Sequence, residues 1–431
     1  MVTPAIICID VEPDGKNIDP HHPAPWKGFE GLQDPIERFR AEIPTHGGRP
    51  RFAWFVRMDP QVEQVYGSPH WAGEKYAHYF RHLFDSGDEV GLHIHPWRWL
   101  SPESGWMQDF QDQTWVSHCV DSSVEAFRNA FGHSCKSVRF GERWLNRRTL
   151  DLLEKKGIRF DLTVEPGPEH WGLPAEGGIR WTFPDYRKAP RVPFHPSIND
   201  IFRPGRKGAR PLWMIPVSTS AGVTPPRELP EGNGGGLLRI EPNPILMGTH
   251  ADRAVATISW EVEGTRRVDV RINAPNGVLF CGGNARGSAT TGNWVVDGTT
   301  FFLQDADARN SSSAENTIAV ARASVIAKRD GRSIWRRIRS FLMGSPPVGV
   351  WHSLDLSLEP PEFQRRAHSL LEDPTTVHLT TVLRSDAGSQ PVLRTFIEEN
   401  LRFLAVGQSL RQIEFVTPER AVEILSNDTQ A

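Results

Sequence analysis

The stretch Ala5-Ile-Ile-Cys-Ile9 is a short apolar run, and Asp10-Val-Glu12 follows it at once. This pattern predicts a buried β-strand whose carboxyl end carries two acidic side chains. Further apolar runs alternate with segments of helical periodicity, at residues 51–58, 90–94, 137–140, 158–164 and 212–217. Alternating strands and helices indicate parallel pairing through helical crossovers, and six strands are too few to close such a barrel.

The pattern changes between residues 238 and 324, where short alternating runs are divided by Gly, Asn and Asp turns. This spacing is typical of an antiparallel β-sandwich, with Trp260 and Trp294 as core candidates, and a long ornamented loop is the alternative. The first pattern then resumes, with strands expected at 353–358, 378–383 and 414–416. We therefore expect an α/β fold, a (β/α) barrel interrupted by an inserted all-β sandwich. The expected parts are 1–236 (N-terminal barrel), 237–326 (sandwich) and 327–431 (linker and C-terminal barrel).

Composition restricts the class of protein. The 431 residues carry a formal charge of −3, which argues against a nucleic-acid partner. No apolar stretch is long enough to span a membrane. The four cysteines show no C-x-x-C spacing, and the N-terminus lacks a signal-peptide pattern, so a cytoplasmic protein is expected. Composition leaves the oligomeric state open.

Polar residues gather where the predicted strands end. The first strand ends in Asp10 and Glu12, the third in His93-Ile-His95-Pro-Trp97, and the fourth in Arg139-Phe-Gly-Glu142. The fifth continues through Asp161-Leu-Thr-Val-Glu165, and the eighth ends at Arg384. Because the carboxyl ends of parallel strands share one face of a barrel, these side chains are expected on one rim.

His93 and His95 lie two residues apart on a strand, so their side chains project from the same face. Together with the acidic pair of the first strand, they form a candidate site for one divalent ion. Two hydrogen-bonded structural histidines are the alternative.

The quoted segments around Asp10, His93 and Arg139 resemble the first three motifs of the polysaccharide deacetylases, the NodB-homology enzymes of carbohydrate esterase family 4. The likeness is to a divergent branch with D-V-E and H-x-H-P-W, and it covers roughly residues 1–220 and 345–431. It implies a distorted (β/α) barrel, and the insert predicted from the turn spacing is expected to be an Ig-like sandwich. It also implies a divalent metal, with zinc expected first and cobalt, nickel or manganese as alternatives, and removal of N-acetyl groups from amino sugars.

The resemblance also implies roles for individual residues. Asp10 matches the general base, Arg139 the arginine that orients it, and Asp161 the fourth-motif carboxylate. His93 matches a metal ligand and Glu12 stands nearest a second. The usual second histidine position is occupied by Trp97, so His95 must substitute for it.

The chain departs from the family at the fifth motif, where Arg384 replaces a histidine that acts as general acid. Arginine does not release a proton near neutral pH, so another group must protonate the leaving amine. His195 is a candidate, while Arg384 can bind a carboxylate or polarise a carbonyl.

The sequence holds 15 tryptophans. Trp97, Trp99 and Trp144 follow strand ends, where indole faces suit a saccharide. Capping of the apolar barrel mouth is the alternative reading for each. The combined expectation is a metal-dependent hydrolase of a C–N amide bond, most simply an amino-sugar or polysaccharide N-deacetylase. A glycan-binding or scaffolding protein on a catalytically altered barrel, and an enzyme acting on a cyclic amide or an ester, remain as alternatives.

Overall fold

The computed structural model describes most of the chain. The described residues are 2–14, 22–42, 48–101, 105–167, 172–173, 181–182, 186, 189–205, 209–222, 235–243, 245–247, 254–291, 295, 299–308, 313–323, 325–327, 350–406 and 412–428. Trp294 and most of the 327–349 linker lie outside these ranges. The chain divides into two units. Unit 1 comprises residues 1–169, 184–222 and 350–431, and unit 2 comprises residues 170–183 and 223–349.

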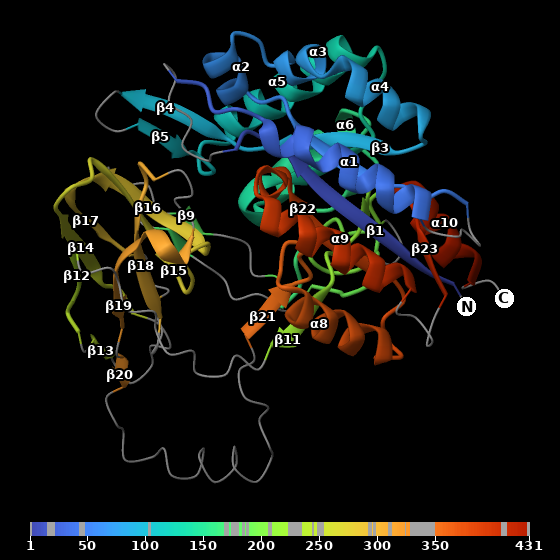
Figure 1. Ribbon diagram of the computed structural model, residues 1–431. Coiled ribbons are helices and arrows are strands. Elements are labelled where there is room, and N and C mark those ends of the chain that lie inside the picture. Colours follow the sequence, from blue (N-terminus) through green and yellow to red (C-terminus); the bar gives the residue numbers. More distant parts are fainter. Residues whose placement is uncertain are drawn as a thin grey trace. The chain divides into compact units, whose positions relative to one another are not determined.

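Unit 1 is built on one parallel sheet (Figure 1). Its strand order is β10-β7-β6-β3-β2-β1-β22, and β23 pairs with the first half of β1. The strands are β1 (Val2–Val11), β2 (Ala53–Arg57), β3 (Glu89–Ile94), β6 (Ser137–Phe140), β7 (Phe160–Asp161), β10 (Trp213–Met214), β22 (Leu379–Arg384) and β23 (Gln412–Phe415). Six of them precede the insert and two follow it, which confirms the α/β class.

Backbone hydrogen bonds of the segment that follows β10 connect the two ends of this sheet, which curls into a distorted barrel. After β10, the Ser218 N–H donates to the Thr380 carbonyl, and the Leu354 N–H donates to the Ser218 carbonyl (2.9 Å each). The strand expected over 353–358 is reduced to a single parallel bridge between Asp355 and Val382. That prediction was therefore wrong in length, although the segment still joins the two edges.

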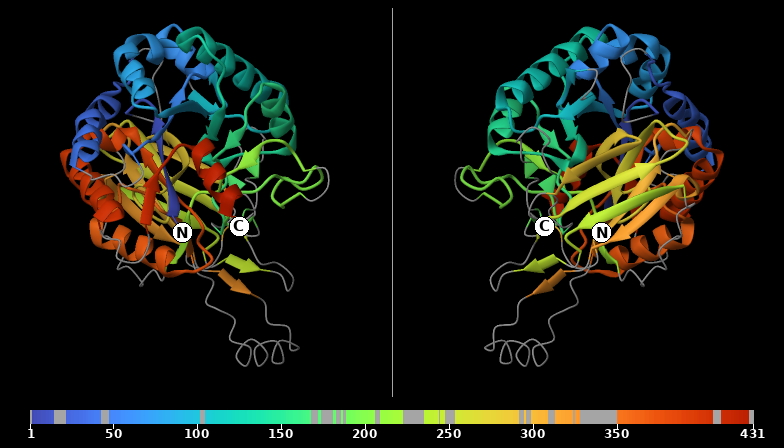
Figure 2. Two further views of the ribbon diagram at one scale, coloured as in Figure 1. Left: turned by 90° about the vertical axis from the view of Figure 1, so that its right-hand side faces the viewer. Right: turned by 90° about the vertical axis from the view of Figure 1, so that its left-hand side faces the viewer.

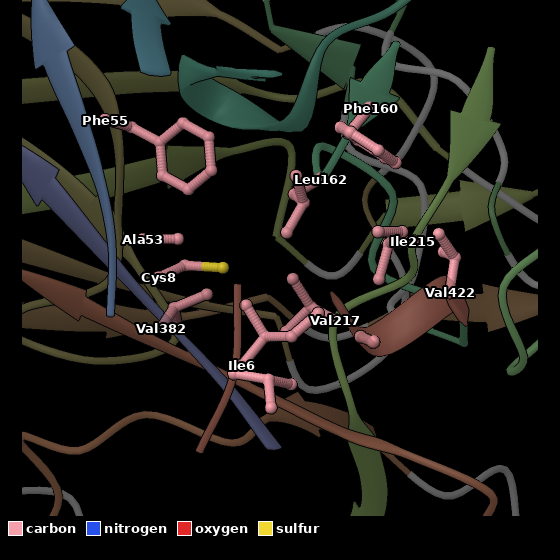
Figure 3. Packing of buried hydrophobic residues seen from close by; sticks show 12 residues of the cluster. Ile6, Cys8, Ala53, Phe55, Phe160, Leu162, Ile215, Val217, Val382 and Val422 are labelled. Atoms are coloured by element: carbon pink, nitrogen blue, oxygen red, sulfur yellow. The ribbon is translucent and has the colours of Figure 1, made fainter. Parts of the chain in front are cut away.

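The inside of the barrel is apolar near the middle of the strands. Cys8, Phe55, Leu162, Val217 and Val382 belong to one fully or almost fully buried cluster, and Figure 3 shows their side chains directed toward a common centre. Because side chains alternate along a strand, the next inward position on each strand lies above this cluster, toward the carboxyl ends.

Helices cover the outside of the sheet, as Figure 2 shows. They are α1 (Lys27–Glu42), α2 (Pro60–Tyr66), α3 (Trp71–Lys75), α4 (Ala77–Asp85), α5 (Gln113–Phe131), α6 (Arg147–Lys155), α8 (Pro360–Glu372), α9 (Pro391–Val406) and α10 (Pro418–Asp428). Two small antiparallel pairs complete the unit, β4 (Trp97–Ser101) with β5 (Gly105–Gln108) and β11 (Thr219–Gly222) with β21 (Val350–Ser353). Among the helices that the structure describes, none has the length and apolar character needed to cross a bilayer.

Unit 2 contains antiparallel sheets, as the turn-rich sequence predicts. One has the order β12 (Gly236–Glu241), β14 (Thr257–Val262), β17 (Arg286–Thr290), and another the order β16 (Val278–Asn284), β15 (Arg267–Ile272), β18 (Thr300–Asp305), β19 (Thr317–Arg322). Two short pairs accompany them, β8 (Gly172–Leu173) with β9 (Trp181–Thr182) and β13 (Ile245–Met247) with β20 (Val325–Ala327). The unit includes more of the chain than 237–326, and its description as an Ig-like sandwich stays a prediction.

Candidate metal centre

The inward positions above the apolar cluster carry the polar residues. Asp10 follows Cys8 on the inner face of β1, and it is level with Arg384 of β22. On the neighbouring strands, Arg57, His93 and Arg139 share the next level. The sheet register therefore places charged and imidazole side chains from five strands at one end of the barrel.

Glu12, His93 and His95 form a buried group whose ligand atoms all lie within 4.8 Å of one another. The two Nε2 atoms are 2.9 Å apart, and Glu12 Oε2 lies 3.7 Å from His95 Nε2. Each residue is less than 5% exposed, so the group is shielded from bulk solvent.

The orientation of His93 is fixed by the neighbouring strand. Its Nδ1 lies 2.8 Å from the Arg139 carbonyl oxygen, which can only accept a hydrogen bond. Nδ1 therefore carries the proton, and the lone pair of Nε2 points toward His95. A histidine that donates its second ring N–H to a carbonyl is the usual arrangement for a metal ligand.

Glu12 stands one residue beyond the end of β1 and is held at both its backbone and its side chain. Its N–H donates to Ser385 Oγ, and the Ser385 hydroxyl donates to the Glu12 carbonyl (3.1 Å each). Arg384 Nε donates to Glu12 Oε1 at 2.8 Å, and Arg384 Nη2 contacts Asp386 at 2.6 Å. Desolvation lowers the pKa of Arg384, but the charges of Asp386 and Glu12 outweigh it and raise that pKa, so the guanidinium stays charged.

The ring of His95 is enclosed by its neighbours. A Cβ added to Gly141 would lie 2.0–2.3 Å from three atoms of the His95 ring, so only glycine fits at this position. Trp97 stacks at 6.4 Å on the imidazole and is itself buried. The loop after β6 and the hairpin after β3 therefore define where this imidazole lies.

Asp10 is held by Arg139. Arg139 Nε donates to both carboxylate oxygens at 3.1 and 3.2 Å, and Asp10 Oδ1 lies 3.6 Å from His93 Nδ1. Burial would lower the pKa of Arg139, but the charges of Asp10 and Glu165 outweigh it and raise that pKa.

Glu165 is a partner of Arg139 to which the sequence pattern gave no role. Its Oε1 accepts from Arg139 Nη2 at 3.0 Å, and its Oε2 accepts from the Ser353 hydroxyl at 2.5 Å. Burial raises the pKa of Glu165, yet Arg143 and Arg139 together bring it below its ordinary value. The only signal in the sequence is its place at the end of the fifth strand segment.

Asp161, expected to tune the base, bonds to Thr163 instead. Its two oxygens accept from the Thr163 N–H (3.0 Å) and hydroxyl (3.1 Å). Burial raises the pKa of Asp161 to about 7, against the lowering effect of these bonds and of Arg139. Its catalytic role stays a prediction.

The expected saccharide contacts are spread over several places. Trp144 is buried and stacks on Phe110 at 5.0 Å, whereas the half-buried Trp99 meets Trp106 edge to face at 5.2 Å. His195 Nδ1 lies 3.2 Å from the Leu212 carbonyl, and its ring packs on Trp213. This position is at the amino end of β10, whereas the Glu12–His93–His95 group is at the carboxyl ends of the strands.

The donor set fits a divalent cation. Two imidazole nitrogens and one carboxylate oxygen converge, and this combination is common in catalytic zinc sites that leave a coordination position open. The hydrogen bond at His93 Nδ1 and the ion pair at Glu12 Oε1 are the outer contacts that such ligands require.

No protein-family model and no curated protein matches the sequence. Among solved structures, the chain is similar to a proposed polysaccharide deacetylase from Mycobacterium smegmatis, with 9% identity, a TM-score of 0.42, and coverage of 99% of this chain and 92% of that one. It is also similar to a proposed polysaccharide deacetylase of O-antigen biosynthesis from Bordetella bronchiseptica, with 15% identity, a TM-score of 0.23, and coverage of 49% and 56%. A third is IcaB from Ammonifex degensii, with 11% identity, a TM-score of 0.21, and coverage of 38% and 85%. TM-scores this low carry no argument about function. Function is inferred from the site residues instead.

Proposed function

We propose that this protein is a metal-dependent hydrolase of a C–N amide bond that removes N-acetyl groups from an amino sugar or polysaccharide. The observation that carries the proposal is the buried convergence of Glu12, His93 and His95 beside the Asp10–Arg139 pair. Glu12 Oε2 and the Nε2 atoms of both histidines would hold the ion, and zinc is the first candidate.

A divalent ion at this position would supply a Lewis acid for the amide carbonyl and lower the pKa of water. Asp10 would accept the proton of the attacking water on its carboxylate. Arg139 keeps that carboxylate oriented through two contacts from Nε, and Glu165 in turn holds Arg139. The base thus belongs to a buried chain of alternating charges that needs no rearrangement during the reaction.

The leaving amine needs a proton as the C–N bond breaks. Arg384 does not provide it, because its pKa is raised above that of an ordinary arginine. His195 packs at the amino end of β10, whereas Glu12, His93 and His95 lie at the carboxyl ends of the strands. We assign this step to Asp10, which holds the proton taken from water and would return it to the amine nitrogen.

Metal analysis of the purified protein and of His93→Ala and His95→Ala variants tests the metal centre. We expect about one ion per chain in the wild type and loss of that ion in both variants. Acetate release from a panel of N-acetylated saccharides, with zinc, cobalt, nickel and manganese in turn, then tests the reaction. Unchanged metal content in both variants would refute the site.

A glycan-binding protein without hydrolase activity is the second candidate. The observation that favours it is Arg384, which stands where the family has its acid and is paired with Glu12, an expected metal ligand. Binding to a glycan array, combined with no acetate release under any of the four metals, would select this candidate.

A further inference from the structure

Asp59 is a buried carboxylate next to the metal centre but outside the proposed ligand set. It lies two residues after the end of β2, and its side chain is 0% exposed. Its Oδ2 accepts from the backbone N–H of His95 at 3.2 Å. His95 follows Ile94, the last residue of β3, so this carboxylate takes the place of a strand partner for the His95 backbone.

The charge of Asp59 is held by an equally buried cation. Arg57 Nε donates to Oδ2 at 2.9 Å, and Arg57 Nη2 reaches both carboxylate oxygens at 2.8 and 2.9 Å. Arg57 Nη2 also donates to Gln61 Oε1 at 2.6 Å. The guanidinium therefore fixes the carboxylate plane in one direction, with Oδ2 toward His95.

A buried ion pair is a costly way to stabilise a fold, because apolar residues of similar size are often at least as stabilising. Asp59 also accepts from the N–H groups of Gln61 and Val62, which caps α2, but an uncharged Ser or Asn would serve as that cap. The feature that a cap does not explain is the contact with His95. Gly141 and Trp97 bound the ring of this histidine, and Asp59 holds its backbone.

We propose that Asp59, oriented by Arg57, is a positioning residue that holds His95 in the geometry required to bind the metal ion. This inference rests on the proposed function, since it assigns His95 as a ligand. Contacts beyond the ligands themselves typically change metal affinity by ~10–100-fold when they are removed.

The test compares Asp59→Asn with a matched control, Asp88→Asn. Asp88 is also fully buried in its side chain and paired with an arginine, Arg40. It accepts from the Phe52 N–H at 3.0 Å and the Trp54 indole at 2.8 Å. It precedes β3, whereas His95 follows that strand, so the control removes a similar charge at the opposite end of the same strand.

The dissociation constant for Zn²⁺ is measured on the full chain by competition with a chromogenic chelator, and the visible spectrum of the Co²⁺ form reports the ligand geometry. We expect the Asp59→Asn variant to bind Zn²⁺ ~10–100-fold more weakly with an altered Co²⁺ spectrum. We expect Asp88→Asn to lower thermal stability while leaving the Zn²⁺ dissociation constant and the Co²⁺ spectrum unchanged.

If Asp59→Asn does not fold, Asp59→Ser replaces it, because serine keeps the cap of α2 while its side chain is shorter and uncharged. Wild-type affinity and spectrum in the folded variant would overturn the inference and leave the proposed function intact. Equal weakening in Asp88→Asn would also overturn it, since the effect would then be one of general stability. A wild-type protein that binds no metal would overturn the proposed function, and this inference with it.

Discussion

Gly141 shows how one residue without a side chain positions a functional one. A methyl group there would overlap the His95 ring at 2.0–2.3 Å, and the imidazole is the part that must move. We predict that Gly141→Ala weakens Zn²⁺ binding at least about 10-fold and destabilises the fold by about 1–3 kcal/mol, the usual cost of overpacking. Chelator competition and urea unfolding measure the two effects.

Gly235→Ala is the control, since nothing lies within 4 Å of a Cβ at that position. It should change neither quantity. Unweakened Zn²⁺ binding by Gly141→Ala would show that His95 does not bind the ion in the orientation described above.

Substitution of Arg384 is expected to affect metal binding and turnover differently. Its guanidinium contacts Glu12 Oε1 and so opposes a second cation at the same carboxylate. We predict that Arg384→Ala binds Zn²⁺ as tightly as the wild type or a few-fold more tightly, while kcat for acetate release falls at least about 10-fold. Titration and steady-state kinetics on the same preparation measure both.

Arg402→Ala, which removes a half-exposed arginine paired with Glu42, is the control and should leave both values unchanged. Full turnover by the Arg384→Ala variant would show that this guanidinium does not polarise the substrate carbonyl.

At the scale of the element, the residue that immediately precedes β22 is a histidine whose protonation depends on pH. His378 is buried, and its Nε2 lies 3.0 Å from the Pro216 carbonyl. Burial lowers the pKa of His378 to about 4, although the bond to Pro216 opposes that shift. Between about pH 6.5 and pH 4 the unfolded chain binds a proton at this residue and the folded chain does not, so stability falls as the pH falls.

We predict that protonation of His378 in the unfolded chain lowers the free energy of unfolding by up to about 3 kcal/mol between about pH 6.5 and pH 4. His378→Gln keeps a donor for Pro216 without a titrating ring and should show a smaller loss. Urea unfolding at several pH values measures it, with the exposed His118→Gln as control. The same pH dependence in wild type and His378→Gln would contradict the assignment.

The elements also show where sequence patterns fail. A capping-box spacing at Ser122 and Glu125 suggests a helix start, but α5 begins at Gln113, where Asp112 accepts from the Thr114 and Trp115 N–H groups. Asp112 is an equally good cap, and burial of Val116, Cys119 and Val120 in the first turns of α5 favours the longer helix. Local capping signals compete, and packing decides between them.

At the scale of the whole molecule, the insert leaves and re-enters unit 1 at neighbouring positions. Gly222 of β11 is the register partner of Val350 of β21. A two-residue Asn-Gly turn can therefore replace residues 223–349, because such turns join antiparallel strands directly. We predict that this shortened chain folds and keeps one Zn²⁺, since Glu12, His93 and His95 all belong to unit 1.

Circular dichroism and metal analysis of the shortened chain check this prediction, and the same chain carrying His93→Ala is its control. A folded chain that has lost its metal would show that the insert takes part in the site.

The sequence by itself predicted the alternation of strands and helices, the antiparallel insert, and the polar strand ends at Asp10, His93, Arg139 and Arg384. These features depend on side-chain periodicity and on the rule that parallel strands end on one face, and both can be read along the chain. Only the tertiary structure decided which side chains pair. It joined Glu165 to Arg139, Asp59 to His95 and Arg384 to Glu12, and it placed His195 at the amino end of β10. Such pairings depend on sheet register and on close approach between distant segments, which no local pattern encodes.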